Sequence, residues 1–294
     1  MKVSVVVPSW NRIGLLPETL DAILAQTHPP LEVILVDDGS TDGTPAMVAT
    51  RYAGRVHVLR LPNGGDLMAR NAGLAVARGQ LVAFCDSDDL WQPDFLEAMV
   101  RLWRAEPKVR VAFADFVILR NGQRAATTKF SSAPPGFWNG LRPVVPDGMA
   151  VFDQPILRRV IGFQPFFPSA MVADADFLRA IGGWDATVGR VVGTDFATIL
   201  LLAEHVPFGV IHRPLVAIRK HPGGYSADVQ AMNLGDATIL EHVLARRPSL
   251  HAHGGLINAS VATRRVQALE IAFARQDHAE IGRASCRERV CSTV

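Results

Sequence analysis

The chain has 294 residues, of which 49% are apolar and 20% are charged, and its formal net charge is +2. This composition is typical of a soluble globular protein with one large domain or two small ones, and it excludes a disordered or fibrous chain. The small net charge gives no reason to expect a nucleic-acid partner. Because no apolar run approaches the ~20 residues of a membrane span, we expect a cytoplasmic protein. Peripheral contact with the inner face of the membrane remains an alternative.

Strand and helix patterns alternate from the first residues onward. A β-branched run from Val3 to Val7 ends at Pro8, as in a strand buried on both faces of a sheet. Apolar residues then recur at helical spacing until Pro29 and Pro30 stop the pattern. The alternation predicts strands at residues 3–7, 31–36, 56–61 and 81–85, with helices at 16–24, from 44 and at 67–78. It indicates a mostly parallel α/β sheet covered by helices, with ligands bound at the carboxyl ends of the strands.

The rest of the chain is less regular. Residues 133–168 contain many prolines and few periodic apolar positions, so we expect a partly irregular insertion that borders an acceptor site. Further patterns predict strands at 109–119, 169–172 and 208–212, and helices at 174–181, 195–204, 227–245 and 254–275. We therefore expect a catalytic domain at 1–226, a C-terminal helical extension at 227–279 and a non-native tail at 280–294. A disordered native tail is the alternative for the last segment.

The first candidate site is the run Asp86-Ser87-Asp88-Asp89, which directly follows an apolar strand. Carboxylates this close repel one another unless a cation or hydrogen-bond donors compensate, and a hard divalent ion prefers oxygen ligands. A solvated helix cap made by Asp88 or Asp89 is the structural alternative.

A second acidic loop occupies the equivalent place after the strand at 31–36. It begins with Asp37 and Asp38 and continues to Thr44. Asp and Gly are common turn formers, so such a loop needs no function. A carboxylate at a strand end can, however, accept a hydrogen bond from the ring N–H of a base or from a ribose hydroxyl.

These two segments and five others form an ordered set. The set comprises Val5-Val6-Val7-Pro8-Ser9-Trp10-Asn11, Val36-Asp37-Asp38-Gly39-Ser40-Thr41-Asp42, Ala69-Arg70-Asn71-Ala72-Gly73, Phe84-Cys85-Asp86-Ser87-Asp88-Asp89, Gly182-Gly183-Trp184-Asp185, Thr194-Asp195 and, more loosely, residues 219–226. Over about residues 2–226 the chain resembles glycosyltransferase family 2. The resemblance implies the nucleotide-binding GT-A fold, and each motif follows a predicted strand or loop in the expected order.

The resemblance implies a site for a nucleotide diphosphate sugar, with UDP or dTDP as the favoured nucleotide. Its residues would be Pro8, Ser9, Trp10, Asn11, Asp37, Asp38, Arg70 and Asp86. Asp37 would accept the N3–H of uracil or thymine, Asp86 would contact the ribose, and Arg70 would lie near the diphosphate or form a structural salt bridge. Trp10 stands where the family usually has tyrosine, and its ring can still stack near the base.

The resemblance also implies a metal site and an acceptor site. Asp88 and His221 would bind Mg²⁺ or Mn²⁺, Trp184 and Asp185 would form the acceptor floor, and Asp195 would be the catalytic base. Thr194 replaces a glutamate that the family has beside this aspartate. The structural alternatives are a surface histidine, a glycine-rich helix end before Trp184 and a helix cap at Asp195.

The expected activity is metal-dependent, inverting transfer of the hexosyltransferase type to a glycan or lipid-linked acceptor, in polysaccharide or glycoconjugate synthesis. One alternative is a non-catalytic module that binds nucleotide sugars. Another is a sugar nucleotidyltransferase, which would need a Gly-rich basic loop after the first strand, where this chain has Pro8 to Arg12.

Overall fold

The computed structural model describes residues 1–221 and 228–275 and divides into two compact units. The first unit comprises residues 1–186 and 198–221. The second comprises residues 187–197 and, among the described residues, the chain from 228 onward. The expected domain boundary at 226 stays a prediction, and the sequence pattern did not indicate that 187–197 belongs with the C-terminal helices.

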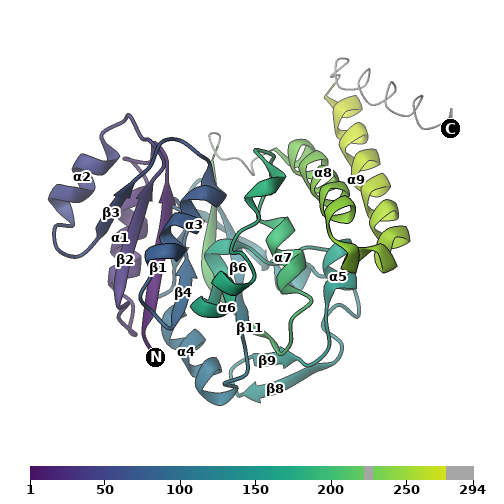
Figure 1. Cartoon of the computed structure of the whole chain (residues 1–294), viewed down its shortest axis with the longest axis horizontal. Helices are drawn as coiled ribbons and strands as arrows, with labels where there is room; N and C mark the ends of the chain where they lie inside the picture. Colours follow the sequence, from purple (N-terminus) through teal and green to yellow (C-terminus); the bar gives the residue numbers. More distant parts are fainter. Residues whose placement is uncertain (222–227, 276–294) are drawn as a thin grey trace. The chain divides into compact units, whose positions relative to one another are not determined.

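The first unit contains most of the strands and helices (Figure 1). Its strands are β1 (Val3–Ser9), β2 (Glu32–Asp37), β3 (His57–Arg60), β4 (Leu81–Phe84), β5 (Leu90–Trp91), β6 (Val111–Arg120), β7 (Gln123–Thr128), β8 (Leu141–Val145), β9 (Met149–Phe152), β10 (Met171–Asp174) and β11 (Phe208–Lys220). Its helices are α1 (Leu16–Leu24), α2 (Thr44–Arg51), α3 (Asp66–Val76), α4 (Phe95–Ala105), α5 (Leu157–Gly162) and α6 (Ala175–Ala180), with short turns η1 (Phe130–Ser132) and η2 (Pro168–Ala170). Helix α7 (Phe196–Leu202) begins in the second unit and ends in the first.

The strands form one sheet in the order β3-β2-β1-β4-β10-β6-β11-β9-β8, with β5 beside β11 and β7 beside β6. Strands β3, β2, β1 and β4 are parallel, and β6 and β11 form a second parallel pair. Strand β10 lies antiparallel between β4 and β6. The predicted α/β sheet is confirmed, and the antiparallel strands are additions that the alternating pattern did not reveal.

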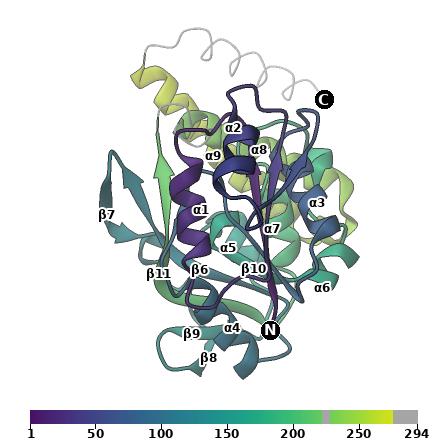
Figure 2. The same cartoon turned by 90° about the vertical axis from the view of Figure 1, so that its left-hand side faces the viewer.

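Helices cover both faces of the parallel half of the sheet. On one face Val3, Val5 and Val7 pack into a core with α1 and α4. On the other face Val6 lies under α3, where a Cβ on Gly73 would come within 2.3 Å of a Val6 methyl carbon. Figure 2 shows α1 on one side of the sheet and α3 and α6 on the other. Glycine at position 73 therefore lets α3 lie close to the sheet.

Residues 133–168 are more regular than expected. Strand β9 pairs antiparallel with the start of β11, β8 pairs with β9, and α5 follows them. The prediction of a partly irregular insertion did not include these strands, because they are ordered by β11, a partner far away in the sequence. Helix α4 and strands β5 and β7 were also missed.

The second unit is a helical hairpin with an added segment. Helices α8 (Val229–Arg246) and α9 (Gly254–Ala274), joined by η5 (Pro248–His253), lie within about two residues of the predicted ranges. Residues 187–197 pack against α8 so closely that a Cβ on Gly235 would lie 2.0 Å from the carbonyl oxygen of Val192. No helix in the described ranges is both long and apolar enough to cross a membrane. The predicted tail at 280–294 and the motif residues Pro222 to Ser226 lie outside the described residues.

Candidate functional site

The candidate site lies at the carboxyl ends of β1, β2 and β4. These strands are parallel and in register, so their ends meet at one edge of the sheet. Ser9 and Asp37 are paired at this edge, and the run from Asp86 to Asp89 follows β4. The topology therefore brings the two acidic loops of the sequence analysis together.

Asp37 is fully buried at the end of β2. One carboxylate oxygen, Oδ2, accepts a hydrogen bond from Arg60 Nε at 3.2 Å. The other, Oδ1, is buried without a hydrogen-bond partner among the described residues. Because a buried, unpaired carboxylate oxygen is costly, this atom indicates a missing donor such as the N–H of a ligand.

Asp38 and Asn11 hold the neighbouring loops together. Asp38 accepts hydrogen bonds from the backbone N–H groups of Gly64 at 2.7 Å and Gly65 at 2.9 Å. Asn11, whose φ of 51° lies in the left-handed region, accepts a hydrogen bond from Thr41 N at 2.8 Å. The structure thus gives these two side chains partners inside the protein, whereas Trp10 is 44% exposed beside them.

The buried guanidinium of Arg70 connects α3 with the loop after β4. It donates to Asp86 Oδ1 at 2.7 Å and to Asp66, one helical turn earlier. Its central carbon lies 5.1 Å from the ring centroid of Trp184. Desolvation raises the pKa of Asp86, and the Arg70 charge opposes that rise. Arg70 thus forms salt bridges within the protein, the alternative given above, and its place near a diphosphate stays a prediction.

Asp88 and His221 lie within contact distance, although they are far apart in the sequence. His221 Nε2 is 2.9 Å from Asp88 Oδ2, and Arg12 Nε is 3.7 Å from the same oxygen. Carboxylate oxygen and imidazole nitrogen are ligands that Mn²⁺ accepts. Within the described ranges no group of three or more His, Cys, Asp or Glu side chains could hold a metal.

Asp89 is 3% exposed and joins two distant segments. It accepts hydrogen bonds from Ser169 Oγ at 2.5 Å and from the backbone N–H of Arg219 at 2.9 Å. Burial and the neighbouring carboxylates raise the pKa of Asp89 well above its ordinary value. No sequence signal predicted these partners, because Ser169 lies in no motif and Arg219 contributes only its backbone N–H.

The Gly-Gly-Trp-Asp loop is held by Asn71. Its side chain accepts a hydrogen bond from Trp184 N and donates to Trp184 O, both at 2.8 Å. Gly183 has a φ of +71°, and a Cβ there would lie 2.4 Å from Asn71 Oδ1. Asn71 lies in the motif at 69–73, but the sequence alone did not predict that it would bind the backbone of Trp184.

Trp184 differs from the expected open platform for an acceptor sugar. Its side chain is only 1% exposed, and it packs edge-to-face on Phe84 with ring centroids 5.1 Å apart. The ring is covered because Arg70 lies over it. A sugar cannot stack on this indole as the structure stands. Asp185, which follows it, is half-buried and donates its backbone N–H to Thr198 Oγ1 at 2.8 Å.

Asp195 directly precedes α7 and is half-buried. It belongs to the second unit, whereas the other predicted site residues belong to the first. The role of Asp195 as a base therefore stays a prediction.

Comparison with known proteins gives consistent results. The family model described as Glycosyl transferase family 2 matches residues 4–161. The chain is 45% identical over 98 residues to the putative teichuronic acid biosynthesis glycosyltransferase TuaG of Bacillus subtilis, covering 32% of this chain and 39% of the relative. It is 41% identical over 119 residues to the succinoglycan biosynthesis protein ExoO of Rhizobium meliloti, covering 40% and 34%. The chain thus spans well under half the length of these relatives.

Solved structures with the same fold include S. aureus TarS in complex with UDP-GlcNAc, with a TM-score of 0.64 and 21% identity over 91% of this chain and 73% of that one. They also include the mannosyltransferase PcManGT from Pyrobaculum calidifontis in complex with GDP-Man and Mn²⁺, with a TM-score of 0.58 and 23% identity over 98% and 80%. The expected GT-A type of fold is confirmed by these neighbours.

Proposed function

Because the chain belongs to glycosyl transferase family 2, we propose that it transfers a sugar from a nucleotide diphosphate sugar to an acceptor hydroxyl. The observation that carries the proposal is the buried, unpaired oxygen of Asp37 at the same sheet edge as Asp86 and Asp88. An acceptor for a base N–H thus lies at the edge that also carries carboxylates suited to a ribose and a metal.

The nucleotide is a uridine or thymidine diphosphate in this proposal. Their bases present an imide N3–H, which can donate a hydrogen bond to Asp37 Oδ1 while Arg60 donates to Oδ2. Pro8 and Ser9 end β1 beside Asp37, and the exposed ring of Trp10 offers a surface on which the base can stack. Asp86 remains 35% exposed and can accept a ribose hydroxyl.

Asp88 and His221 would hold Mg²⁺ or Mn²⁺. Their ligand atoms already lie 2.9 Å apart, and both side chains are partly accessible. A bound divalent ion would neutralise the charge that develops on the departing diphosphate. Arg12, which approaches the same carboxylate, adds positive charge on this side of the site. The first unit therefore offers donor atoms of the right chemistry without a complete ligand set of its own.

The acceptor is a glycan or a lipid-linked sugar, and Asp195 is the base that removes its hydroxyl proton. The acceptor oxygen then attacks the anomeric carbon from the face opposite the diphosphate, so the configuration inverts. A role in the synthesis of polysaccharides or glycoconjugates is supported by the relatives TuaG, of teichuronic acid biosynthesis, and ExoO, of succinoglycan biosynthesis.

The test is a ligand panel read by thermal unfolding. A ligand that binds only the folded state raises Tm by mass action. We expect UDP and dTDP, with Mn²⁺ or Mg²⁺, to raise Tm more than GDP. Asp37→Asn should weaken UDP binding by about tenfold or more, because the amide replaces a carboxylate acceptor.

The control variant is Asp176→Asn, whose carboxylate is 96% exposed on α6. It should bind UDP like the wild type. If no nucleotide raised the Tm of the wild type, or if Asp37→Asn bound UDP normally, the proposed donor site would be wrong.

A further inference from the structure

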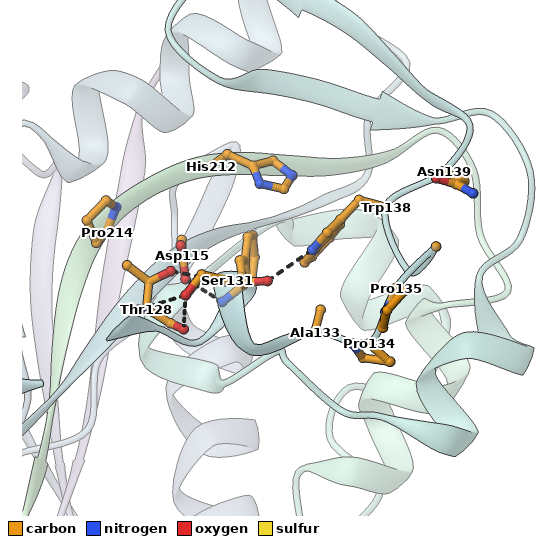
Figure 3. Close-up of a pocket in the computed structure, with 12 residues that line it drawn as sticks. Asp115, Thr128, Ser131, Ala133, Pro134, Pro135, Trp138, Asn139, His212 and Pro214 are labelled. Atoms are coloured by element: carbon orange, nitrogen blue, oxygen red, sulfur yellow. Dashed lines mark hydrogen bonds between the residues drawn. The ribbon is translucent and has the colours of Figure 1, made fainter. Parts of the chain in front are cut away.

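A separate pocket of about 490 Å³ lies in the first unit and shares no residue with the candidate site. Strands β6 and β11 form one wall, and residues 128–139 form the other (Figure 3). Sites for small ligands typically occupy about 300 to 1,000 Å³, so this pocket is large enough for a sugar residue. Nothing in the donor chemistry proposed above uses it.

The pocket is preformed by hydrogen bonds at its base. Asp115, which is 4% exposed in β6, accepts backbone N–H groups from Phe116 and Phe130 through one oxygen, both at 2.8 Å. The indole N–H of Trp138 donates to the carbonyl oxygen of Phe130 at 3.1 Å. Figure 3 shows the hydrogen bonds that Asp115 and Trp138 make with the loop at 128–139. The wall at 128–139 is therefore fixed before any ligand arrives.

The lining offers apolar rings beside free polar groups. Trp138 is half-buried and has its only donor occupied, so it presents apolar surface, as do Pro134 and Pro135. The His212 ring contacts the Trp138 ring edge-to-face, with ring centroids 4.6 Å apart. The imidazole of His212 and the amide of Asn139 hydrogen-bond to no other side chain or backbone group within the described ranges. Both remain available to a ligand.

The charge of the lining limits the ligand class. The lining residues include one carboxylate, Asp115, and neither lysine nor arginine. A phosphate or another anion would be repelled by this carboxylate and would find no cation. Partial burial lowers the pKa of His212, which favours the neutral imidazole with one donor and one acceptor. The ligand is thus a neutral molecule that combines apolar C–H faces with many hydroxyl groups.

Resting on the proposed function, we propose that this pocket binds a neutral sugar residue of the acceptor glycan, away from the hydroxyl that reacts. A pyranose ring can pack its C–H face on the exposed rings of Pro134 and Pro135 while its hydroxyls bond to His212 and Asn139. The pocket would then select acceptors by the units that precede their growing end.

The test measures saccharide binding without turnover. Disaccharides and longer oligomers of neutral hexoses and N-acetylhexosamines are titrated against the full chain, with saturation-transfer NMR as the readout. His212→Ala and Asn139→Ala each remove one exposed polar side chain, so the fold should persist, and thermal unfolding checks this. We expect each variant to weaken binding by about tenfold. His57→Ala, an exposed histidine on β3, should bind like the wild type.

UDP binding is measured on the same samples. The inference is overturned if no saccharide of the panel binds the wild type, or if both pocket variants bind saccharides normally while UDP still binds. In that case the proposed donor site stands. If saccharides bind as expected but UDP does not, the proposed function fails and the pocket remains a saccharide site.

Discussion

Asp88 and Asp89 are sequence neighbours with different surroundings. The Asp88 carboxylate is 17% exposed and contacts His221, whereas Asp89 is buried between Ser169 and the backbone of Arg219. At the scale of single residues, this difference separates metal binding from support of the fold, a distinction that the acidic run alone could not make.

The two residues should therefore fail in different assays. Asp88→Ala should abolish Mn²⁺-dependent stabilisation by UDP with little change in the free energy of unfolding. Asp89→Ala leaves Ser169 and the Arg219 N–H without their acceptor, so it should lower that free energy by about 1 to 3 kcal/mol. Urea unfolding and Mn²⁺ titration by calorimetry measure the two effects. If Asp89→Ala lost metal binding and Asp88→Ala kept it, the metal ligand would be Asp89 and not Asp88.

Asp195 gives a second prediction at this scale. Asp195→Asn keeps the shape but cannot accept a proton, so transfer should fall by about 10²- to 10⁴-fold while UDP affinity stays unchanged. Initial rates and UDP titration measure these quantities. Asparagine caps helices as well as aspartate does, so a residue that only caps α7 would tolerate the change. Near-normal transfer would direct the search for the base to Asp185.

At the scale of elements, Glu32 ties the start of β2 to its neighbours. Its carboxylate accepts hydrogen bonds from Ser4 Oγ at 2.6 Å in β1 and from the Arg78 backbone N–H at 2.7 Å after α3. Burial alone would raise the pKa of Glu32, but these bonds and the Arg78 charge lower it below 4.5. The ionised carboxylate therefore stabilises the folded state.

The sign of the pH effect follows from the lowered pKa. The contribution is fully present above the unfolded pKa and is lost as the pH falls through the folded pKa. Glu32→Gln should cost about 1.5 to 3 kcal/mol at pH 7, and the gap to the wild type should shrink in acid below pH 4.5. Urea unfolding at several pH values measures it. The exposed Glu270→Gln serves as control, and a gap independent of pH would contradict the account.

The elements that the sequence predicted are those with local signals. Strands β1 to β4 and helices α1 to α3 carry buried runs or helical periods bounded by Pro and Gly, and their ranges agree with the prediction within a few residues. The direction of β10 depends on its partners β4 and β6, and the order in 141–152 depends on β11. No local pattern specifies these distant partners. The same reason applies to the candidate site. The positions of Asp37 and Asp86 follow from the predicted strand ends, whereas Ser169, the hydrogen-bond partner of Asp89, comes from a distant segment.

At the scale of the molecule, the segment that carries Asp195 belongs to a unit built on α8 and α9. A Cβ on Gly235 would meet the backbone carbonyl of Val192, which cannot swing aside as a side chain can. This close approach helps to order 187–197 within the second unit, together with contacts such as that of Thr187 Oγ1 with His242 Nε2 at 3.0 Å.

Gly235→Ala should loosen that segment and cost about 1 to 3 kcal/mol of local stability. Hydrogen exchange should become faster in 187–197 and α8 but not in β1 or β2, and transfer should fall with UDP affinity unchanged. Gly255→Ala, where a Cβ would meet open space, is the matched control and should not raise exchange. Unchanged protection in 187–197 would show that the contact does not order it.

The place of β10 has a consequence for synthesis on the ribosome. Strands β1 to β4 are close in the sequence and can pair early, but the free edge of β4 is covered only when Met171 to Asp174 emerge. The edge of β6 that pairs with β11 is covered later still, when Phe208 and the residues after it emerge. Throughout that interval the nascent chain exposes the edge of a hydrophobic strand, which is open to pairing with other chains. Ribosome-stalled chains that end before Met171 should therefore bind chaperones, and release should be complete only when β11 has emerged.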